Sequence, residues 1–162
     1  KGRFLREIPI SQLGEDKQEE MSKNLERYSL YEAYEVRQVL ETKAMDLIVR
    51  NATDSDLDEI ETAYQTMLLR FAETNTTTGE FELHQLYAKK TGSVFMEQTL
   101  NIVLSTILEM MHTTSHNVMD MHQVEEEKAD HRRIIDALHK RDSSAAQQAM
   151  YDHIQHTLDI LQ

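Results

Sequence analysis

The chain has 162 residues and a formal net charge of −12, because 29 acidic side chains outnumber 17 Lys and Arg. This length is enough for one domain with a sizeable core, and such an acidic surface repels phosphate backbones, so we expect no nucleic-acid binding by this segment itself. Disulfides and thiolate zinc sites are excluded because cysteine is absent, and no apolar run is long enough for a membrane span or a secretory signal.

The composition predicts an all-α domain. Only four Gly and one Pro are present, whereas Leu, Met, Ala, Glu and Gln, which are good helix formers, are frequent. Residues 1–14 lack helical periodicity, and Ile8 and Ile10 on either side of Pro9 suggest a short extended arm. Residues 15–28 are strongly charged and carry a thin apolar stripe, so they predict either a short exposed helix or a linker.

Further segments show the apolar spacing of helices, over about residues 29–50, 54–72, 80–90, 93–118, 124–139 and 143–161. Ser29 is a suitable N-cap for the first of these, and Thr53 with Asp56 forms a capping-box-like pair before the second. A polar loop over residues 73–79 follows, and Gly92 ends the short third helix. Together these features predict a single antiparallel bundle of six or seven helices.

The last two predicted helices each place a histidine on an apolar stripe. His131 and His153 fall in line with apolar residues at helical spacing (Ile134, Ile135 and Leu138; Ala146, Ala149 and Met150). His131 lies ten residues before Arg141, in the tight turn, and His153 lies twelve residues after it, so the two rings should stand at matching heights on antiparallel neighbours. Two such histidines are either satisfied core residues or half of a metal site.

The short helix offers partners for these two histidines. Glu80 and His84 are spaced i, i+4, which puts both side chains on one helical face. With His131 and His153 they make three imidazoles and one carboxylate, a set that suits Zn²⁺, Ni²⁺ or Mn²⁺ and leaves coordination positions open if the metal is octahedral. Taken singly, Glu80 could simply favour a helix N-terminus and His84 could be a lone core histidine; taken together, three inward histidines are costly to bury without a common purpose.

The other histidines are weaker candidates for metal binding. His112 and His116 are spaced i, i+4 but lie in a polar stretch that is typical of a solvated face. His122 and His139 lie near helix ends, and at a helix C-terminus such as that after His139 a cation is favourable. His156 falls off the stripe that His153 joins.

Two polar residues near the predicted core could bind a ligand. Arg37 lies beside the apolar stripe that begins with Val36 and Leu40, and an arginine turned toward a core can hold a carboxylate bidentately. The alternative for Arg37 is a surface pair with Glu41 one turn later. Asn101 lies near the middle of the fourth predicted helix, where it could donate to a ligand or be a satisfied polar core residue.

The sequence gives little support to an enzyme. It contains no nucleophile motif, no glycine-rich phosphate loop and no zinc-protease signature. Di-iron bundles of the ferritin type use Glu-x-x-His pairs, whereas Glu80 and His84 are four residues apart. A metal site in this chain would therefore lack visible catalytic machinery.

Three runs of residues carry a family resemblance. They are Arg37-x-x-Leu40-Glu41, then Glu80-x-x-Leu83-His84 followed by Ala88-x-x-Thr91-Gly92, and finally His131-x-x-Ile134-x-x-Ala137-Leu138-x-x-x-Asp142-x-x-x-Ala146-x-x-x-Met150-x-x-His153. They resemble the start, centre and end of the FCD domain, the C-terminal effector domain of the FadR branch of GntR-type bacterial transcription regulators. The resemblance covers about residues 30–160.

The resemblance implies a helical bundle that binds a divalent metal through Glu80, His84, His131 and His153. It also implies a small organic acid as effector, with Arg37 lining its pocket. The family usually has Asp where this chain has Glu80, and Asn where this chain has Ser93 after Thr-Gly. Members that bind acyl-CoA lack the histidine set, so this chain resembles the metal-containing class.

The resemblance further implies a sensor domain, residues 15–162, within a homodimeric cytoplasmic regulator. Residues 2–5 resemble the last strand of a winged-helix wing, so residues 1–14 would be the remnant of a wing and linker, and DNA contact would belong to an absent N-terminal domain. Effector binding would change the spacing of the DNA-binding domains. A metal-dependent helical enzyme and a metal-free helical interaction module remain as alternatives.

Overall fold

The computed structural model describes residues 30–74, 78–114 and 121–161. These residues form six helices and no strand: α2 (Leu30–Asn51), α3 (Asp54–Thr74), α4 (Thr78–Lys90), α5 (Val94–Thr114), α6 (Met121–His139) and α7 (Ser143–Ile160). The all-α prediction is confirmed. The arm predicted over residues 1–14, the seventh helix considered for residues 15–28 and the Ser29 cap lie outside the described residues.

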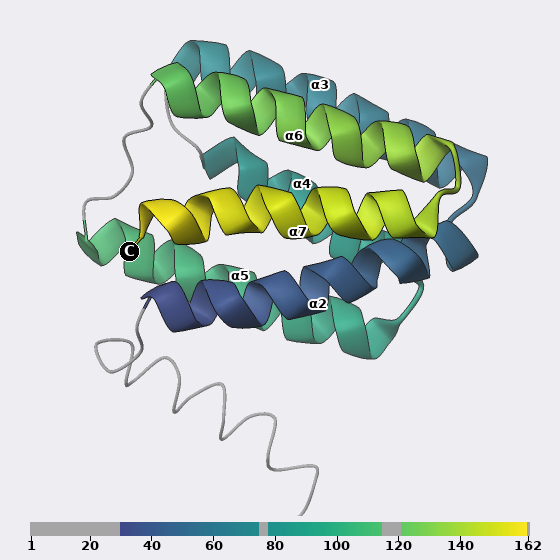
Figure 1. Ribbon diagram of the computed structural model, residues 1–162, viewed down its shortest axis with the longest axis horizontal. Helices are drawn as coiled ribbons and strands as arrows, with labels where there is room; N and C mark the ends of the chain where they lie inside the picture. The colour runs from purple at the N-terminus through teal and green to yellow at the C-terminus, as the bar shows by residue number, and fades with distance from the viewer. Residues whose placement is uncertain (1–29, 75–77, 115–120, 162) are drawn as a thin grey trace, which may run out of the picture.

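The helices form a closed cycle of neighbours. In order around the bundle, α2 packs on α7, α7 on α6, α6 on α3, α3 on α4, α4 on α5, and α5 again on α2. Figure 1 shows α2 and α7 running side by side in opposite directions, as do α6 and α7. Because α2 also reaches α4 and α6 across the cycle, the interior is bounded by α2, α4, α6 and α7.

Local signals in the sequence account for several helix boundaries. The Thr53 backbone N–H donates to Asp56 Oδ2 (2.8 Å) and the Asp56 N–H donates to Thr53 Oγ1 (3.1 Å), so the capping box predicted before α3 is confirmed. Ser93 caps α5 through its hydroxyl, and Asp142 caps α7.

The predicted loop over residues 73–79 is too long. Helix α3 continues to Thr74 and α4 already begins at Thr78. Gly79 falls within the first turn of α4, where an added Cβ would lie 3.4 Å from two carbon atoms of the Arg70 side chain. These are ordinary contact distances, so Gly79 is not required by a close approach of α4 to α3, and here it does not mark a loop.

The buried side of α2 also differs from the predicted stripe. Val36 is 51% exposed, whereas Arg37 and Glu41 are 0% and 1% exposed. Further along α2 the stripe is apolar as expected, with Ala44 and Ile48 fully buried. The prediction for Val36 is wrong because the inward side of this helix turn carries the ion pair of Arg37 and Glu41, and a search for apolar periodicity cannot detect buried charged residues.

The turn between α6 and α7 is held by an arginine in the left-handed region. Arg141 has φ +54°, and the Asp142 N–H donates to Ala137 O as in a Schellman motif. The guanidinium of Arg141 donates to Ala52 O (2.6 Å) and to Asp54 Oδ1 (2.7 Å), at the turn between the end of α2 and the start of α3. One residue therefore joins the α6–α7 turn to the α2–α3 turn.

Candidate metal centre

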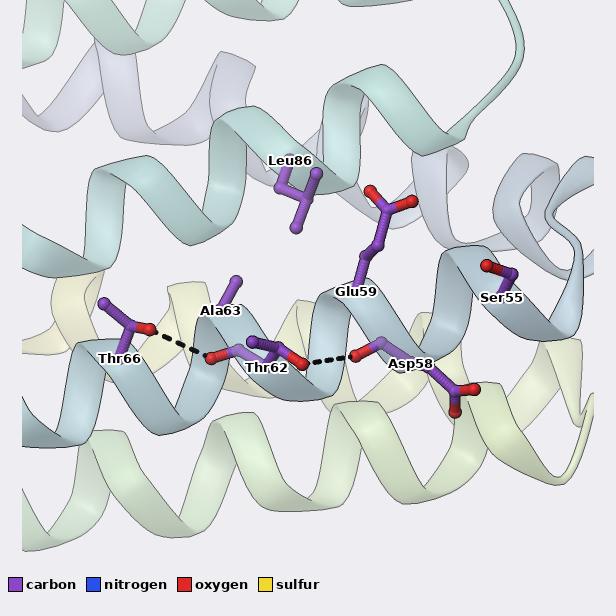
Figure 2. A pocket seen from close by; sticks show the side chains of 7 residues that line it. All are labelled: Ser55, Asp58, Glu59, Thr62, Ala63, Thr66 and Leu86. Atoms are coloured by element: carbon purple, nitrogen blue, oxygen red, sulfur yellow. Dashed lines mark hydrogen bonds between the residues drawn. The ribbon is translucent and has the colours of Figure 1, made fainter.

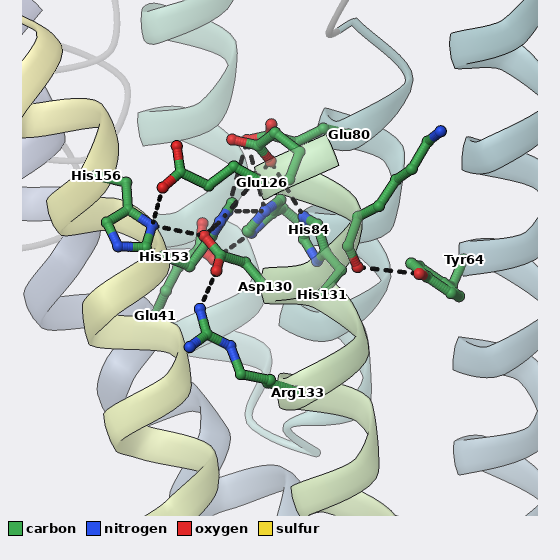
Figure 3. Close-up of polar contacts among 12 residues, drawn as sticks. Glu41, Tyr64, Glu80, His84, Glu126, Asp130, His131, Arg133, His153 and His156 are labelled. Carbon is green, nitrogen blue, oxygen red and sulfur yellow. Dashed lines mark hydrogen bonds and ion pairs between the residues drawn. The ribbon is translucent and has the colours of Figure 1, made fainter. Parts of the chain in front are cut away.

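A cluster of buried polar side chains lies where α2, α4, α6 and α7 meet. It consists of Arg37 and Glu41 from α2, Glu80, His84 and Tyr87 from α4, Glu127, Asp130 and His131 from α6, and His153 from α7. Figure 3 shows the side chains of Glu80, His84, His131 and His153 converging from three helices. The structure thus brings together all four residues predicted as metal ligands.

The three imidazoles stand at the same height in the bundle. The ring centroids of His131 and His153 are 4.5 Å apart, which agrees with the matched heights predicted from the turn. His84 completes the triangle, with its centroid 5.0 Å from that of His131 and 5.3 Å from that of His153. All three residues are at most 1% exposed, and each offers a ring nitrogen within 4.8 Å of the other two.

Each imidazole is held through its Nδ1 atom by a neighbouring polar group. The partners are Glu41 for His84, the Tyr87 hydroxyl for His131 (3.2 Å) and Asp130 Oδ2 for His153 (3.4 Å). With Nδ1 engaged in this way, the Nε2 atoms are the ones that face the interior; His84 Nε2 and His153 Nε2 are 3.3 Å apart. Metal-ligating histidines are oriented by the same kind of contact through the second nitrogen.

The protonation states suit metal binding. Burial lowers the pKa of His84 and, more strongly, that of His131, where the other two histidines add to the effect, so both rings are neutral near pH 7. The Nε2 atom of His131 is buried without a hydrogen-bond partner among the described residues. A buried ring nitrogen without a partner is costly, and in the tautomer that protonates Nδ1 a cation before Nε2 would remove that cost.

Glu80 supplies the carboxylate of the predicted set. Its Oε1 atom lies 3.6 Å from His84 Nε2 and 3.9 Å from His153 Nε2. Burial would raise the pKa of Glu80, but Arg37, His84 and His153 offset that effect and lower it, so Glu80 is ionised. The longer side chain that stands in place of the family's usual Asp therefore does reach the histidines.

Arg37 is fully buried beside this carboxylate. Its Nη2 atom donates to Glu80 Oε1 (3.0 Å), and its Nε atom donates to Glu41 Oε1 (2.8 Å). The guanidinium lies over the Tyr34 and Phe81 rings, 5.2 and 5.3 Å from their centroids. The i, i+4 pair considered in the sequence does form, but inside the core. The remaining nitrogen, Nη1, has no partner among the described residues.

Sequence reasoning missed three acidic residues of the cluster. Glu41 was considered only as a surface partner of Arg37, yet it bridges Arg37 and His84. Glu127 lies one helical turn before His131, a spacing that places both side chains on one helical face but does not show by itself that Glu127 is inward. Asp130 accepts from both His153 and His156, and although burial alone would raise its pKa, these contacts lower it to about 2.

Asn101 and the remaining histidines lie elsewhere. Asn101 lines a shallow depression between α4 and α5 with residues of the outward face of α4, and its Oδ1 atom is buried without a partner among the described residues. His139 is an exposed residue near Glu61, as expected at a helix end. His156 contacts the cluster from outside, through Asp130 (2.8 Å). The side chains of His112, His116 and His122 lie outside the described part of the structure.

A second depression, of about 440 Å³, lies between α3 and α4 (Figure 2). The hydroxyls of Thr62 and Thr66 that line it donate to backbone oxygens one turn earlier in α3. These hydroxyls are therefore satisfied within the helix and do not point to a ligand.

Within the described ranges, no helix combines the length and apolar character that crossing a membrane requires.

The donor set fits a divalent cation. Two overlapping groups have ligand atoms within 4.8 Å of one another: His84, His131 and His153; and Glu80, Glu127, His131 and His153. Neutral imidazoles with carboxylates suit Zn²⁺, Ni²⁺ and Mn²⁺. The unpartnered Nε2 of His131 supports this fit from the structure itself.

Comparison with known proteins bears on the fold and the family of the chain. The structure is similar to Streptococcus agalactiae GntR, with a TM-score of 0.69 and 21% identity over 86% of this chain and 60% of that one. It is also similar to E. coli McbR/YncC, with a TM-score of 0.66 and 16% identity over 80% of this chain and 66% of that one. No curated protein sequence matches the chain significantly. The family model of the FCD domain matches residues 32–156, and the chain therefore belongs to the FCD domain family.

Proposed function

We propose that the chain is the ligand-sensing domain of a bacterial GntR-type transcription regulator, from the metal-containing class of the FadR branch. A divalent metal would be held by Glu80, His84, His131 and His153. The observation that carries this proposal is the convergence of three buried imidazoles, each engaged through Nδ1, together with a buried Nε2 atom of His131 that has no partner among the described residues. A bound metal would supply a Lewis-acidic centre for a small carboxylate.

The proposed effector is a small organic acid. Arg37 supports this choice because its Nη1 atom is a buried N–H donor without a partner among the described residues, beside the Glu80 carboxylate. Asn101 remains a proposed effector contact. Its buried Oδ1 atom lacks a partner, but the depression that it lines is formed by a different face of α4 from the one that carries His84.

The rest of the proposal concerns a longer protein, because the chain spans 60% and 66% of the two solved regulators. We propose a homodimeric cytoplasmic regulator that contacts DNA through an N-terminal winged helix-turn-helix and catalyses no reaction. The acidic net charge of −12 supports this division, since DNA contact by this segment would be repulsive. Effector binding would shift the population of bundle conformations.

Elemental analysis of protein purified without a nickel column tests the metal site. We expect one divalent metal per chain, lost in the double variant His131→Ala/His153→Ala and retained in His139→Ala, which removes an exposed histidine. Absence of stoichiometric metal in the wild type, even after incubation with Zn²⁺, Ni²⁺ or Mn²⁺, would contradict the proposal and favour a metal-free interaction module. Turnover of small carboxylates by the metal-loaded protein would favour an enzyme instead.

A thermal-shift screen of organic acids, with and without chelator, tests the effector. We expect shifts that need both the metal and Arg37. Arg37→Lys is the suitable variant, because it keeps a buried positive charge between Glu41 and Glu80 but removes the planar group that carries Nη1. Equal shifts in the wild type and in this variant would remove Arg37 from the effector site.

A further inference from the structure

Glu127 is a largely buried acidic residue that the four-ligand site does not use. It lies on α6 one turn before His131, so both side chains project from the same helical face. Its side chain is 13% exposed, and its Oε2 atom is buried without a hydrogen-bond partner among the described residues. A carboxylate oxygen in such a place is costly unless a cation or donor completes it.

The position of this oxygen points to the metal site. Oε2 lies 3.7 Å from His131 Nε2 and 3.7 Å from His153 Nδ1. Glu127 also belongs, with Glu80, His131 and His153, to a group whose ligand atoms are within 4.8 Å of one another. The side chains of Glu127 and Glu80 are in hydrogen-bond contact, so two carboxyl groups from different helices meet beside the histidines.

A purely structural role explains only part of this arrangement. A hydrogen bond between Glu80 and Glu127 engages one oxygen of Glu127 and leaves Oε2 turned toward two histidines with no partner among the described residues. A divalent cation at the imidazole nitrogens would satisfy that oxygen and would replace the proton that a hydrogen bond between two carboxyl groups requires.

We propose that Glu127 is a fifth protein ligand of the metal, a proposal that rests on the metal site above. Glu127 would occupy a coordination position that a small carboxylate effector also needs. If the ion is six-coordinate, three imidazoles and two carboxylates would leave one position open, and an effector would gain a second position only by displacing Glu127. Because Glu127 is tethered beside the metal at high effective concentration, a monodentate acid competes poorly with it. The site would therefore favour chelating carboxylates over monodentate ones.

Cobalt substitution tests this proposal directly, because the visible spectrum of Co²⁺ reports its ligands. Chelator-treated full chain would be titrated with Co²⁺ and then with acetate as a monodentate probe and malonate as a chelating one. For Glu127→Ala we expect Co²⁺ binding to weaken by at least about 10-fold, the lower end of the loss seen when only a partner of a ligand is changed, and we expect a changed spectrum. Acetate should then alter the spectrum of the variant more than that of the wild type, because the variant would offer two open positions and the wild type one, while malonate should alter both.

Glu125→Ala is the matched control, since Glu125 lies two residues away on α6 with a 67% exposed side chain. It should behave as the wild type. Glu127→Gln keeps the shape of the side chain and serves the same readout if the alanine variant does not fold. Two outcomes would overturn the role of Glu127 while leaving the four-ligand site intact. In the first, the Glu127 variants keep the wild-type Co²⁺ affinity and spectrum. In the second, acetate changes the wild-type spectrum as strongly as it changes the spectrum of the variants. A wild-type chain that binds no Co²⁺ would instead refute the metal site itself.

Discussion

The charged side chains at the centre of the bundle are linked by consecutive ion pairs and hydrogen bonds. Arg37 joins Glu41 to Glu80, and Glu41 in turn holds His84 through Nδ1. Burial would raise the pKa of Glu41, but the contacts with His84 and Arg37 outweigh it and lower the pKa, so Glu41 is ionised. Such a carboxylate fixes the tautomer of His84 and makes its Nε2 atom more basic.

The first prediction concerns Glu41→Gln. Glutamine can still accept from His84 Nδ1 but brings no charge, so His84 should become a poorer ligand. We expect metal affinity to fall about 10- to 100-fold, which is the usual effect of changing a partner of a ligating histidine. Competition with a chromophoric chelator measures the change. Glu35→Gln, an exposed neighbour on α2, is the control, and equal affinities in the two variants would contradict the role given to Glu41.

The ligands predicted from the sequence are those whose companions on the helix are apolar. His131 and His153 stand out because Ile134 and Met150 mark the buried side of their helices. Glu41 and Glu127 could not be assigned in the same way, because a charged residue at helical spacing is usually on a solvated face. Their burial depends on partners from other helices, which no local pattern contains.

At the scale of elements, the turns between helices contribute to the stability of the fold as the helices do. Gly92 ends α4 with φ +68°, and an added Cβ would lie 3.2 Å from Asn51 Cβ. Arg141 takes a similar conformation without being glycine, at a cost of about 1 kcal/mol. Its contacts with the carbonyl of Ala52 and the carboxylate of Asp54 offset that cost.

The second prediction separates these two contributions at Arg141. Arg141→Ala should lower the free energy of unfolding by about 1–3 kcal/mol, because it removes the contacts to the α2–α3 turn and keeps the unfavourable φ. Arg141→Gly loses the same contacts but relieves the backbone, so it should be more stable than Arg141→Ala by about 1 kcal/mol. Urea denaturation of the two variants measures the difference. Equal stabilities would show that the φ of Arg141 carries no strain.

The third prediction concerns the contact between α3 and α6. Arg132 donates from both terminal nitrogens to the two oxygens of Glu61, each at 2.7 Å, and these bonds lower the pKa of Glu61 to about 2. A carboxylate with a lowered folded pKa stabilises the fold above its unfolded pKa of about 4.5, and this stabilisation is lost as pH falls toward 2. Because both side chains are about one-third exposed, we expect only about 1 kcal/mol from the pair.

Glu61→Gln provides the measurement for this pair. The difference in unfolding free energy between the wild type and this variant should be about 1 kcal/mol at pH 7 and should shrink as pH is lowered from 5 toward 3. Glu109→Gln, an exposed residue on α5, should show no such pH-dependent difference. A difference for Glu61→Gln that stays constant with pH would mean that the variant acts through packing and not through the charge.

At the scale of the whole molecule, the helices divide into two groups. The cluster residues come from α2, α4, α6 and α7, whereas α3 and α5 contribute none of them. The family-typical bundle and most helix boundaries could be predicted from the sequence, because caps and apolar spacing are local. The cycle of neighbours could not, because the pairing of α2 with α7 joins the most distant helices of the described chain.

The fourth prediction uses this division. Adding Zn²⁺ to the chelator-treated chain should slow amide hydrogen exchange in α2, α4, α6 and α7 more than in α3 and α5, because a ligand that binds only the folded centre stabilises the segments that form it. Hydrogen–deuterium exchange with mass spectrometry resolves the helices. The His131→Ala/His153→Ala variant should show no response, and a uniform response of all helices in the wild type would contradict the grouping.

The separation of the ligands along the chain also sets an order of assembly. His84 and His153 meet although they are 69 residues apart in sequence, whereas α6 and α7 form a hairpin around a single tight turn. Contacts between distant segments close large loops and so form after local ones. Metal binding should therefore be a late event in folding. A bound ion would then cross-link helices that had formed separately.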